Sequence, residues 1–180
     1  PFAVMPVGHL WLAALCMLRV RRGTISAYAG AAFLTLAAFI LLGGQLALLV
    51  GLVVFGALSV MVLVLDAKRS FTEQLLGGSA GVLLVILLAA LLFQRFYGDI
   101  VEAVMAFFRQ MFTLTPEIEA MFQQSFVQLY GSEFELDTLL YVLEESLRAN
   151  LPGDVLAYCV YGAGLAVFAA RRVAARMGQI

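Results

Sequence analysis

Long apolar runs dominate the chain, and the clearest one covers residues 46–65, LALLVGLVVFGALSVMVLVL, without a charged or amide side chain or a proline. A helix of this length rises by about 30 Å, the thickness of the hydrocarbon core of a bilayer. Its apolar residues occupy every side of the helix rather than one stripe, which is not the pattern of a soluble amphipathic helix. The run therefore predicts a transmembrane helix.

Four further apolar runs are also long enough to cross a membrane, and they cover residues 2–18, 24–42, 75–93 and 151–170. Only Gly-Gly-Gln at 43–45 separates the second run from the central one, which predicts a tight hairpin. Small residues recur in the second run and in GGSAG at 77–81, and small faces let helices approach closely in lipid. The predicted fold class is all-α: a polytopic transmembrane helical bundle of about five spans.

Residues 97–150 have a different character, because nine acidic and two basic residues give this segment a net charge of −7. Its large apolar residues nevertheless follow helical spacing, which is typical of amphipathic helices rather than of a disordered acidic tail. Thr115 with Pro116 predicts one helix start, and Ser132 with Glu135 predicts a capping box at another. We expect amphipathic helices near 99–112, 116–130 and 133–149, resting on the membrane, on each other or on a partner.

These patterns divide the chain into three parts. Residues 1–96 hold spans one to four, residues 97–150 form an external acidic helical segment, and residues 151–180 hold the last span and a basic tail. Pro152 suits the start of that last helix. The chain begins at Pro1 rather than at a methionine, which leaves open whether further spans precede it.

Composition and charge agree with a multi-pass membrane protein. Hydrophobic residues make up 63% of the chain, charged residues 13%, and the mean hydropathy is +1.00, values that exclude an ordinary soluble domain. Eight of the eleven basic residues fall after the first, third and fifth expected spans. Because basic residues in short loops stay in the cytoplasm, this predicts an outward N-terminus and a cytoplasmic C-terminus.

Searches for catalytic and ligand-binding motifs find none. A single histidine excludes clusters of histidine ligands, and Cys16 and Cys159 lie in apolar runs without CxxC spacing, so we expect no metal and no disulfide. P-loop, GxGxxG and GxSxG motifs are absent, and no basic patch with interleaved aromatic residues predicts nucleic-acid binding. The sequence predicts a protein that is not an enzyme and carries no cofactor.

A small set of polar and aromatic residues in the first and last spans is the candidate ligand pocket. Both spans start from the same expected outer surface, so His9 and Trp11 reach a depth similar to that of Asp154 and Tyr158. Asp154, Tyr158 and Tyr161 stand at i, i+4 and i+7, so they share one helix face and form a polar stripe that descends from the outer end. The alternative is that the aromatic residues anchor the chain at the membrane interface and Asp154 complements a helix N-terminus.

The order of these parts, with RVRRG at 19–23 and the pattern from NLPGD at 150–154 to AARR at 169–172, resembles the YybS-like family of predicted bacterial membrane proteins of unknown function. That family is in turn distantly similar to the substrate-binding S components of energy-coupling-factor vitamin transporters. The resemblance implies a small helical bundle in the bacterial inner membrane that takes a ligand from the outer side. It transfers no functional residue.

The sequence is compatible with two functions. The first is a small-molecule-binding or transport-associated subunit that opens outward between the first and last spans. The second is a structural or accessory membrane subunit whose external helices dock a partner protein or another copy, while its bundle contacts only the lipid bilayer. Polar groups that converge in a closed cavity would favour the first, and an exposed apolar face on the external helices would favour the second.

Overall fold

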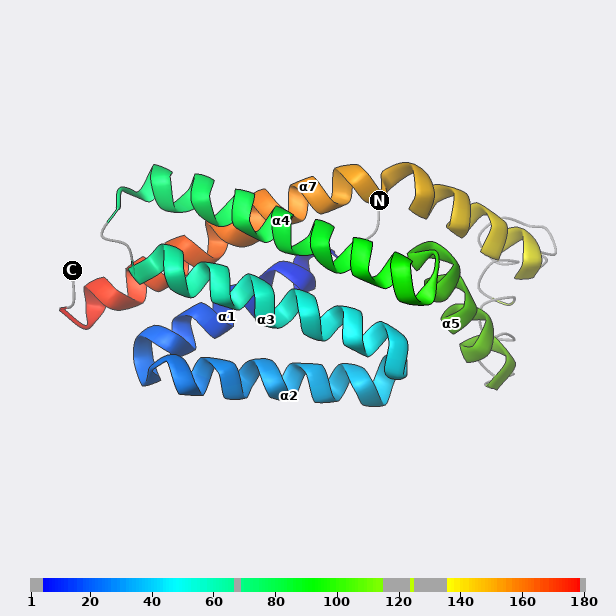
Figure 1. Ribbon diagram of the computed structural model, residues 1–180, viewed down its shortest axis with the longest axis horizontal. Helices are drawn as coiled ribbons and strands as arrows, with labels where there is room; N and C mark the ends of the chain where they lie inside the picture. Colours follow the sequence, from blue (N-terminus) through cyan, green and yellow to red (C-terminus); the bar gives the residue numbers. More distant parts are fainter. Residues whose placement is uncertain (1–4, 67–68, 115–123, 125–135, 179–180) are drawn as a thin grey trace. The chain divides into compact units, whose positions relative to one another are not determined.

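The computed structural model describes residues 5–66, 69–114, 124 and 136–178, and the described elements are all α-helices (Figure 1). The predicted all-α helical bundle is therefore confirmed. The helices are α1 (Met5–Arg22), α2 (Thr24–Leu42), α3 (Gly44–Asp66), α4 (Phe71–Tyr97), α5 (Ile100–Leu114) and α7 (Leu136–Arg176). Of the expected helix at 116–130 only residue 124 is described, and it is helical; the expected caps at Thr115 and Ser132 lie outside the described residues.

Four of the described helices are long and apolar enough to cross a membrane, and the chain is that of a membrane protein. They are α2, α3, α4 and the part of α7 from Leu140 to Arg176. The first expected span corresponds to α1, which contains Arg19, Arg21 and Arg22 within its 18 residues and is not among the four. A fifth span at this position stays a prediction.

The chain divides into two compact units. Unit 1 comprises residues 1–93 and 153–180, and unit 2 comprises residues 94–152. Helices α4 and α7 each contribute to both units.

Single glycines make the first two turns of unit 1. Gly23 joins α1 to α2 with a φ of 92°, and Gly43 joins α2 to α3 with a φ of 80°. Residues with a Cβ rarely adopt this left-handed backbone, so glycine allows each chain reversal to take one residue. The predicted hairpin at 43–45 is thus tighter than expected, because Gly44 and Gln45 already belong to α3.

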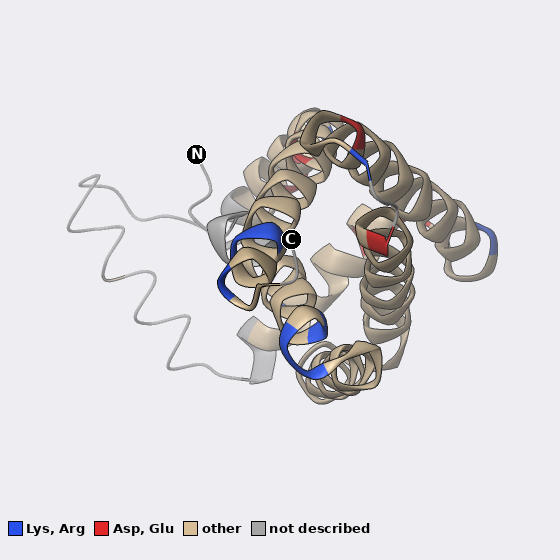
Figure 2. Ribbon diagram, turned by 90° about the vertical axis from the view of Figure 1, so that its left-hand side faces the viewer, with Lys and Arg blue, Asp and Glu red and all other residues tan. Residues whose placement is uncertain are grey.

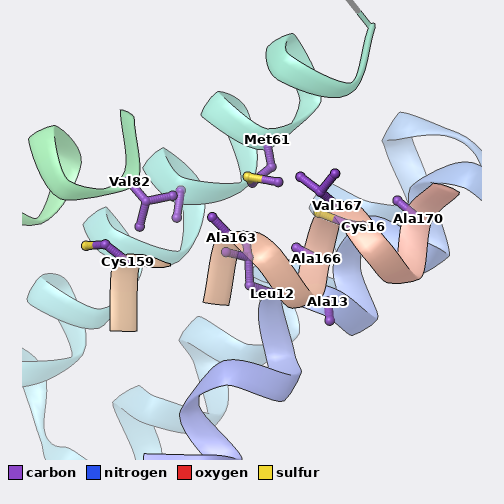
Figure 3. Packing of buried hydrophobic residues seen from close by; sticks show 11 residues of the cluster. Leu12, Ala13, Cys16, Met61, Val82, Cys159, Ala163, Ala166, Val167 and Ala170 are labelled. Carbon is purple, nitrogen blue, oxygen red and sulfur yellow. The ribbon is translucent and has the colours of Figure 1, made fainter. Parts of the chain in front are cut away.

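Two clusters of buried side chains, both including α1 and α3, form the core of unit 1. One cluster also includes α4 and α7 (Figure 3), and the other also includes α2. Alanine is the commonest residue in them, with Ala27 and Ala31 from α2, Ala57 from α3, and Ala163, Ala166 and Ala170 from α7. Small side chains let backbones approach closely, which is how helices gain packing energy where lipid is as apolar as the core.

Helices α3 and α4 interlock through a reciprocal pair of glycines and valines. A Cβ added to Gly56 would lie 2.5 Å from Cγ1 of Val85, and one added to Gly81 would overlap Cγ1 of Val60. Because Val60 follows Gly56 by four residues and Val85 follows Gly81 by four, each valine fills the space above the other helix's glycine. The predicted small face of 77–81 therefore packs against α3.

Helix α7 corrects the expectation that one helix ends near 149 and a separate span starts at Pro152. The structure has one continuous helix of 41 residues with Pro152 inside it. Proline in a helix removes one backbone hydrogen bond, here the bond that the residue 152 nitrogen would donate to the Arg148 carbonyl. The helix continues because both halves are held by packing: Leu140 is buried in unit 2, and Cys159 in unit 1.

Unit 2 has a small apolar core between α5 and the first part of α7. Val101 and Met105 of α5 are buried against Leu140 of α7, with Phe108 beside them. These positions follow helical spacing, so the amphipathic helix expected at 99–112 is present as α5 and uses its apolar face within the unit.

Candidate functional site

Helices α1 and α7 bring together two of the predicted pocket residues, Trp11 and Tyr158. Their rings stack with centroids 6.4 Å apart and an angle of 24° between the planes. Both side chains are half-buried against the core cluster that contains Leu12 and Cys159, and the Tyr158 hydroxyl oxygen is itself buried. An offset stack of this kind is within the favourable range for aromatic pairs.

The other three predicted residues are placed differently. Asp154 is half-buried and lies one helical turn before Tyr158 in α7. Tyr161 is 69% exposed, so its ring lies on the surface of unit 1 rather than in the stack. His9 belongs to α1, but its side chain is outside the described part of the structure.

The stacked pair and Asp154 together offer flat apolar surface next to a carboxylate. Aromatic faces bind planar apolar groups and cations, and a carboxylate one turn away can accept a hydrogen bond or pair with a positive charge. Across the described residues, no group of three or more histidine, cysteine or acidic side chains is arranged to hold a metal ion.

A second constellation lies at the end of unit 1 where α1, α3 and α7 end and α2 and α4 begin (Figures 1 and 2). We call it the basic end. Its described basic residues are Arg19, Arg21, Arg22, Arg69, Arg171, Arg172 and Arg176. The sequence predicted that these arginines lie on one side, and Figure 2 shows blue segments at the ends of α1 and α7 together.

Polar contacts join the helices at the basic end. Arg19 of α1 forms an ion pair with Asp66 at the end of α3. Gln74 of α4, 6% exposed, donates to the Val64 carbonyl at 3.4 Å, and its side-chain oxygen accepts from Nη1 of Arg171 at 3.4 Å. Gln74 was not predicted as a functional residue, and its signal in the sequence is an amide near the start of an apolar span.

Helix α4 also starts at the basic end, with a capping box that was not among the predicted features. The Glu73 carboxylate accepts from both the backbone nitrogen and the hydroxyl of Ser70 at 2.9 Å, and the Glu73 nitrogen donates to the Ser70 hydroxyl at 3.3 Å. The signal was Ser-x-x-Glu at 70–73. Glu73 is thereby engaged in capping rather than in pairing with an arginine side chain.

Helices α2 and α3 are joined by half-buried hydrogen bonds in the apolar part of unit 1. The hydroxyls of Tyr28 and Ser59 are 2.8 Å apart, and Ser59 donates to the Phe55 carbonyl at 2.8 Å. Tyr28 also stacks on Phe55. These contacts satisfy polar groups between two apolar helices, so they hold α2 and α3 together rather than form a binding site.

An ion cluster organises unit 2. Asp99 caps α5 by accepting from the backbone nitrogens of Val101 at 2.7 Å and Glu102 at 3.2 Å, and it accepts from Arg148 of α7 at 2.9 Å. Arg148 also pairs with Glu144 at 3.1 Å. The hydrogen bond from Arg148, assisted by those from the backbone, lowers the pKa of the Asp99 carboxyl below its ordinary value.

No family model, no curated protein and no solved structure matches the chain.

Proposed function

We propose that the protein is a small-molecule-binding or transport-associated subunit of the bacterial inner membrane. The observation that carries the proposal is the stack of Trp11 on Tyr158 inside unit 1, with Asp154 one turn away. Both rings pack against the buried core cluster of unit 1, and binding sites for small organic molecules typically combine such aromatic surface with a few polar groups. The resemblance to the YybS-like family and, distantly, to S components supports the same function.

The proposed orientation places the basic end and the C-terminus in the cytoplasm. The gathering of seven arginines at one end of unit 1 supports it, since basic residues near short loops are retained inside. The Trp11 and Tyr158 pair precedes Arg171 along α7 by about 20 Å of helix, which puts it toward the outer side. The ligand would then enter from outside, and the subunit would need no catalytic group of its own.

Tryptophan fluorescence tests this proposal directly, because Trp11 is the only tryptophan of the chain. The purified protein is examined by native mass spectrometry for a retained non-lipid molecule, which is then removed and titrated back while Trp11 emission is recorded. We expect saturable quenching or a spectral shift. The variant Tyr158→Ala should weaken binding about tenfold, the value of one lost aromatic contact.

Tyr161→Ala is the matched control, because Tyr161 lies three residues further on in the same helix and is exposed. It should leave the titration unchanged. Tyr158→Phe should keep most of the affinity if stacking dominates over the hydroxyl. Equal retention of the molecule by the parent and by Tyr158→Ala would refute the proposal and leave the pair as a packing contact.

The second candidate is an accessory subunit that docks a partner through unit 2. It is favoured by the exposure of Tyr141 and Val142 on the unit 2 part of α7, since large apolar side chains on a surface mark interaction sites. A photoreactive residue in place of Tyr141, used in intact cells, tests it. A single crosslinked protein product of fixed mass supports docking, whereas lipid products alone oppose it.

A further inference from the structure

Arg171 is a half-buried cation without an acidic partner in the described part of the chain. Its one described hydrogen bond goes to the neutral side chain of Gln74. The acidic side chains described at the basic end are already engaged, because Asp66 pairs with Arg19 and Glu73 closes the capping box with Ser70. Among the residues that the structure describes, none therefore compensates the positive charge of Arg171.

The register of α1 and α7 brings Arg19 to the same level as Arg171. The two helices run toward the basic end together, and Cys16 lies beside Val167 in the core (Figure 3). Arg19 follows Cys16 by three residues and Arg171 follows Val167 by four, so each arginine is about one turn beyond the same contact. The Arg19 side chain is only 14% exposed, and its Nε is buried without a hydrogen-bond acceptor among the described residues.

Two guanidinium groups with spare donors at one level present a site for an anion. Arg19 uses one terminal nitrogen for Asp66 and Arg171 uses one for Gln74, which leaves other N–H donors on each group. The planar fork of a guanidinium matches the geometry of a phosphate. A positive charge that is partly withdrawn from water gains most from an anion placed beside it.

The position of Arg19 and Arg171 relative to the membrane indicates which kind of phosphate they would bind. Arg171 lies near the end of α7, one of the four helices apolar enough to cross a membrane, at the level where such a span leaves the hydrocarbon core and reaches the lipid headgroups. Arg19 lies in the last turn of α1, directly after the first expected span. Basic sites between helices at this level are the kind that bind phospholipid headgroups. We propose that the ends of α1 and α7 form a binding site for the phosphate of an anionic phospholipid, with Arg19 and Arg171 as its ligands.

The general attraction of basic loops to anionic lipid does not account for this pair. That attraction requires exposed charges near the surface, and Arg21, Arg22, Arg172 and Arg176 supply it. Arg19 and Arg171 differ from them because both are partly buried and both are fixed by contacts to α3 or α4. The proposed site is also distinct from the Trp11 and Tyr158 pair and does not depend on the proposed ligand function.

The test measures lipid retention by native mass spectrometry of the full chain released from nanodiscs that hold equal parts of phosphatidylglycerol and phosphatidylcholine. We expect retained lipid to be enriched in phosphatidylglycerol. Arg171→Gln should reduce that enrichment at least about fivefold more than Arg176→Gln, which removes the same charge from an exposed position at the same end. Equal effects of the two variants would show diffuse attraction and overturn the proposal.

If Arg171→Gln does not fold, two further measurements on the unmodified protein test the proposed phospholipid site. Raising NaCl from about 0.15 M to 1 M should leave most of the phosphatidylglycerol preference in place, because partly buried ion pairs are screened less than exposed ones. Loss of the preference in 1 M salt would contradict the site. Millimolar inorganic phosphate should not raise the melting temperature; a rise equal to that given by phosphatidylglycerol would identify a soluble phosphate ligand and overturn the lipid assignment.

Discussion

The close packing of α3 against α4 leads us to expect that replacing a glycine by alanine changes the stability differently at Gly77 and at Gly81, although both lie in α4. In Gly81→Ala the new methyl group overlaps Cγ1 of Val60 and lies 3.4 Å from Cγ2 and 3.5 Å from Cβ of that residue. Valine cannot turn away easily, because its branched side chain has one strongly preferred rotamer in a helix. In Gly77→Ala the nearest side-chain atom, Cγ2 of Val64, is 3.8 Å away, an ordinary contact.

Comparing the free energies of unfolding of Gly81→Ala and Gly77→Ala separates the effect of packing from the effect of helix propensity. Both gain roughly 1 kcal/mol when alanine replaces glycine in a helix. Only Gly81→Ala incurs overpacking, which typically costs about 1–3 kcal/mol. We therefore expect Gly81→Ala to have a free energy of unfolding about 1–3 kcal/mol lower than that of Gly77→Ala, although the two substitutions are chemically identical.

The assay is reversible unfolding in mixed micelles, followed by helix content as the denaturing detergent is increased. Val60→Ala, combined with Gly81→Ala, supplies a rescue: the shortened side chain makes room for the methyl group, so the double variant should be more stable than the sum of the single changes predicts. Equal stability of Gly81→Ala and Gly77→Ala, or additive behaviour of the pair, would refute the reasoning about this contact.

Two other predictions concern the polar contacts of each unit. Asp99→Asn should destabilise unit 2 more at neutral pH than near pH 3. Because the pKa of the Asp99 carboxyl is lowered in the folded protein, its contribution is fully present above its ordinary value of about 4 and is lost as the pH falls through the lower folded-state pKa. Hydrogen exchange of α5 at both pH values measures this, and a pH-independent effect would rule out the ion pair as its cause. Ser59→Ala and Tyr28→Phe should each cost about 0.6–1.5 kcal/mol, with a coupling close to the smaller figure in a double-mutant cycle in micelles. A coupling of zero would mean that the hydroxyl contact contributes nothing.

The spans and the tight turns could be predicted from sequence because each depends on local signals. An uncharged run such as residues 46–65 has the length of a bilayer, and glycine at 23 and 43 allows a left-handed backbone where the chain reverses. The continuity of α7 through Pro152 could not be predicted in this way. Proline is compatible with both a helix start and a helix interior, and only the packing of the flanking segments decides between them.

In the candidate site, too, local spacing could be predicted from the sequence, whereas contacts between helices could not. Helical spacing predicted that Asp154, Tyr158 and Tyr161 share one face, but Tyr161 is about 60° away from Tyr158 around the helix, which is enough to move its ring from the core to the surface. The contact of Gln74 with Arg171 joins residues 97 positions apart, and no periodicity within either helix predicts it. Such contacts depend on how helices pack, and only the assembled bundle specifies them.

The central claim, a membrane-spanning bundle with its basic end in the cytoplasm, is tested most directly by cysteine accessibility in intact cells. The natural Cys16 and Cys159 are buried, so the parent should give little background labelling. Cysteine is introduced in place of the exposed residues Arg172, at the basic end, and Glu145, in the acidic segment. We predict that a membrane-impermeant maleimide labels position 145 in intact cells and labels position 172 only after permeabilisation; labelling of 172 but not of 145 in intact cells, or of both, would contradict the account.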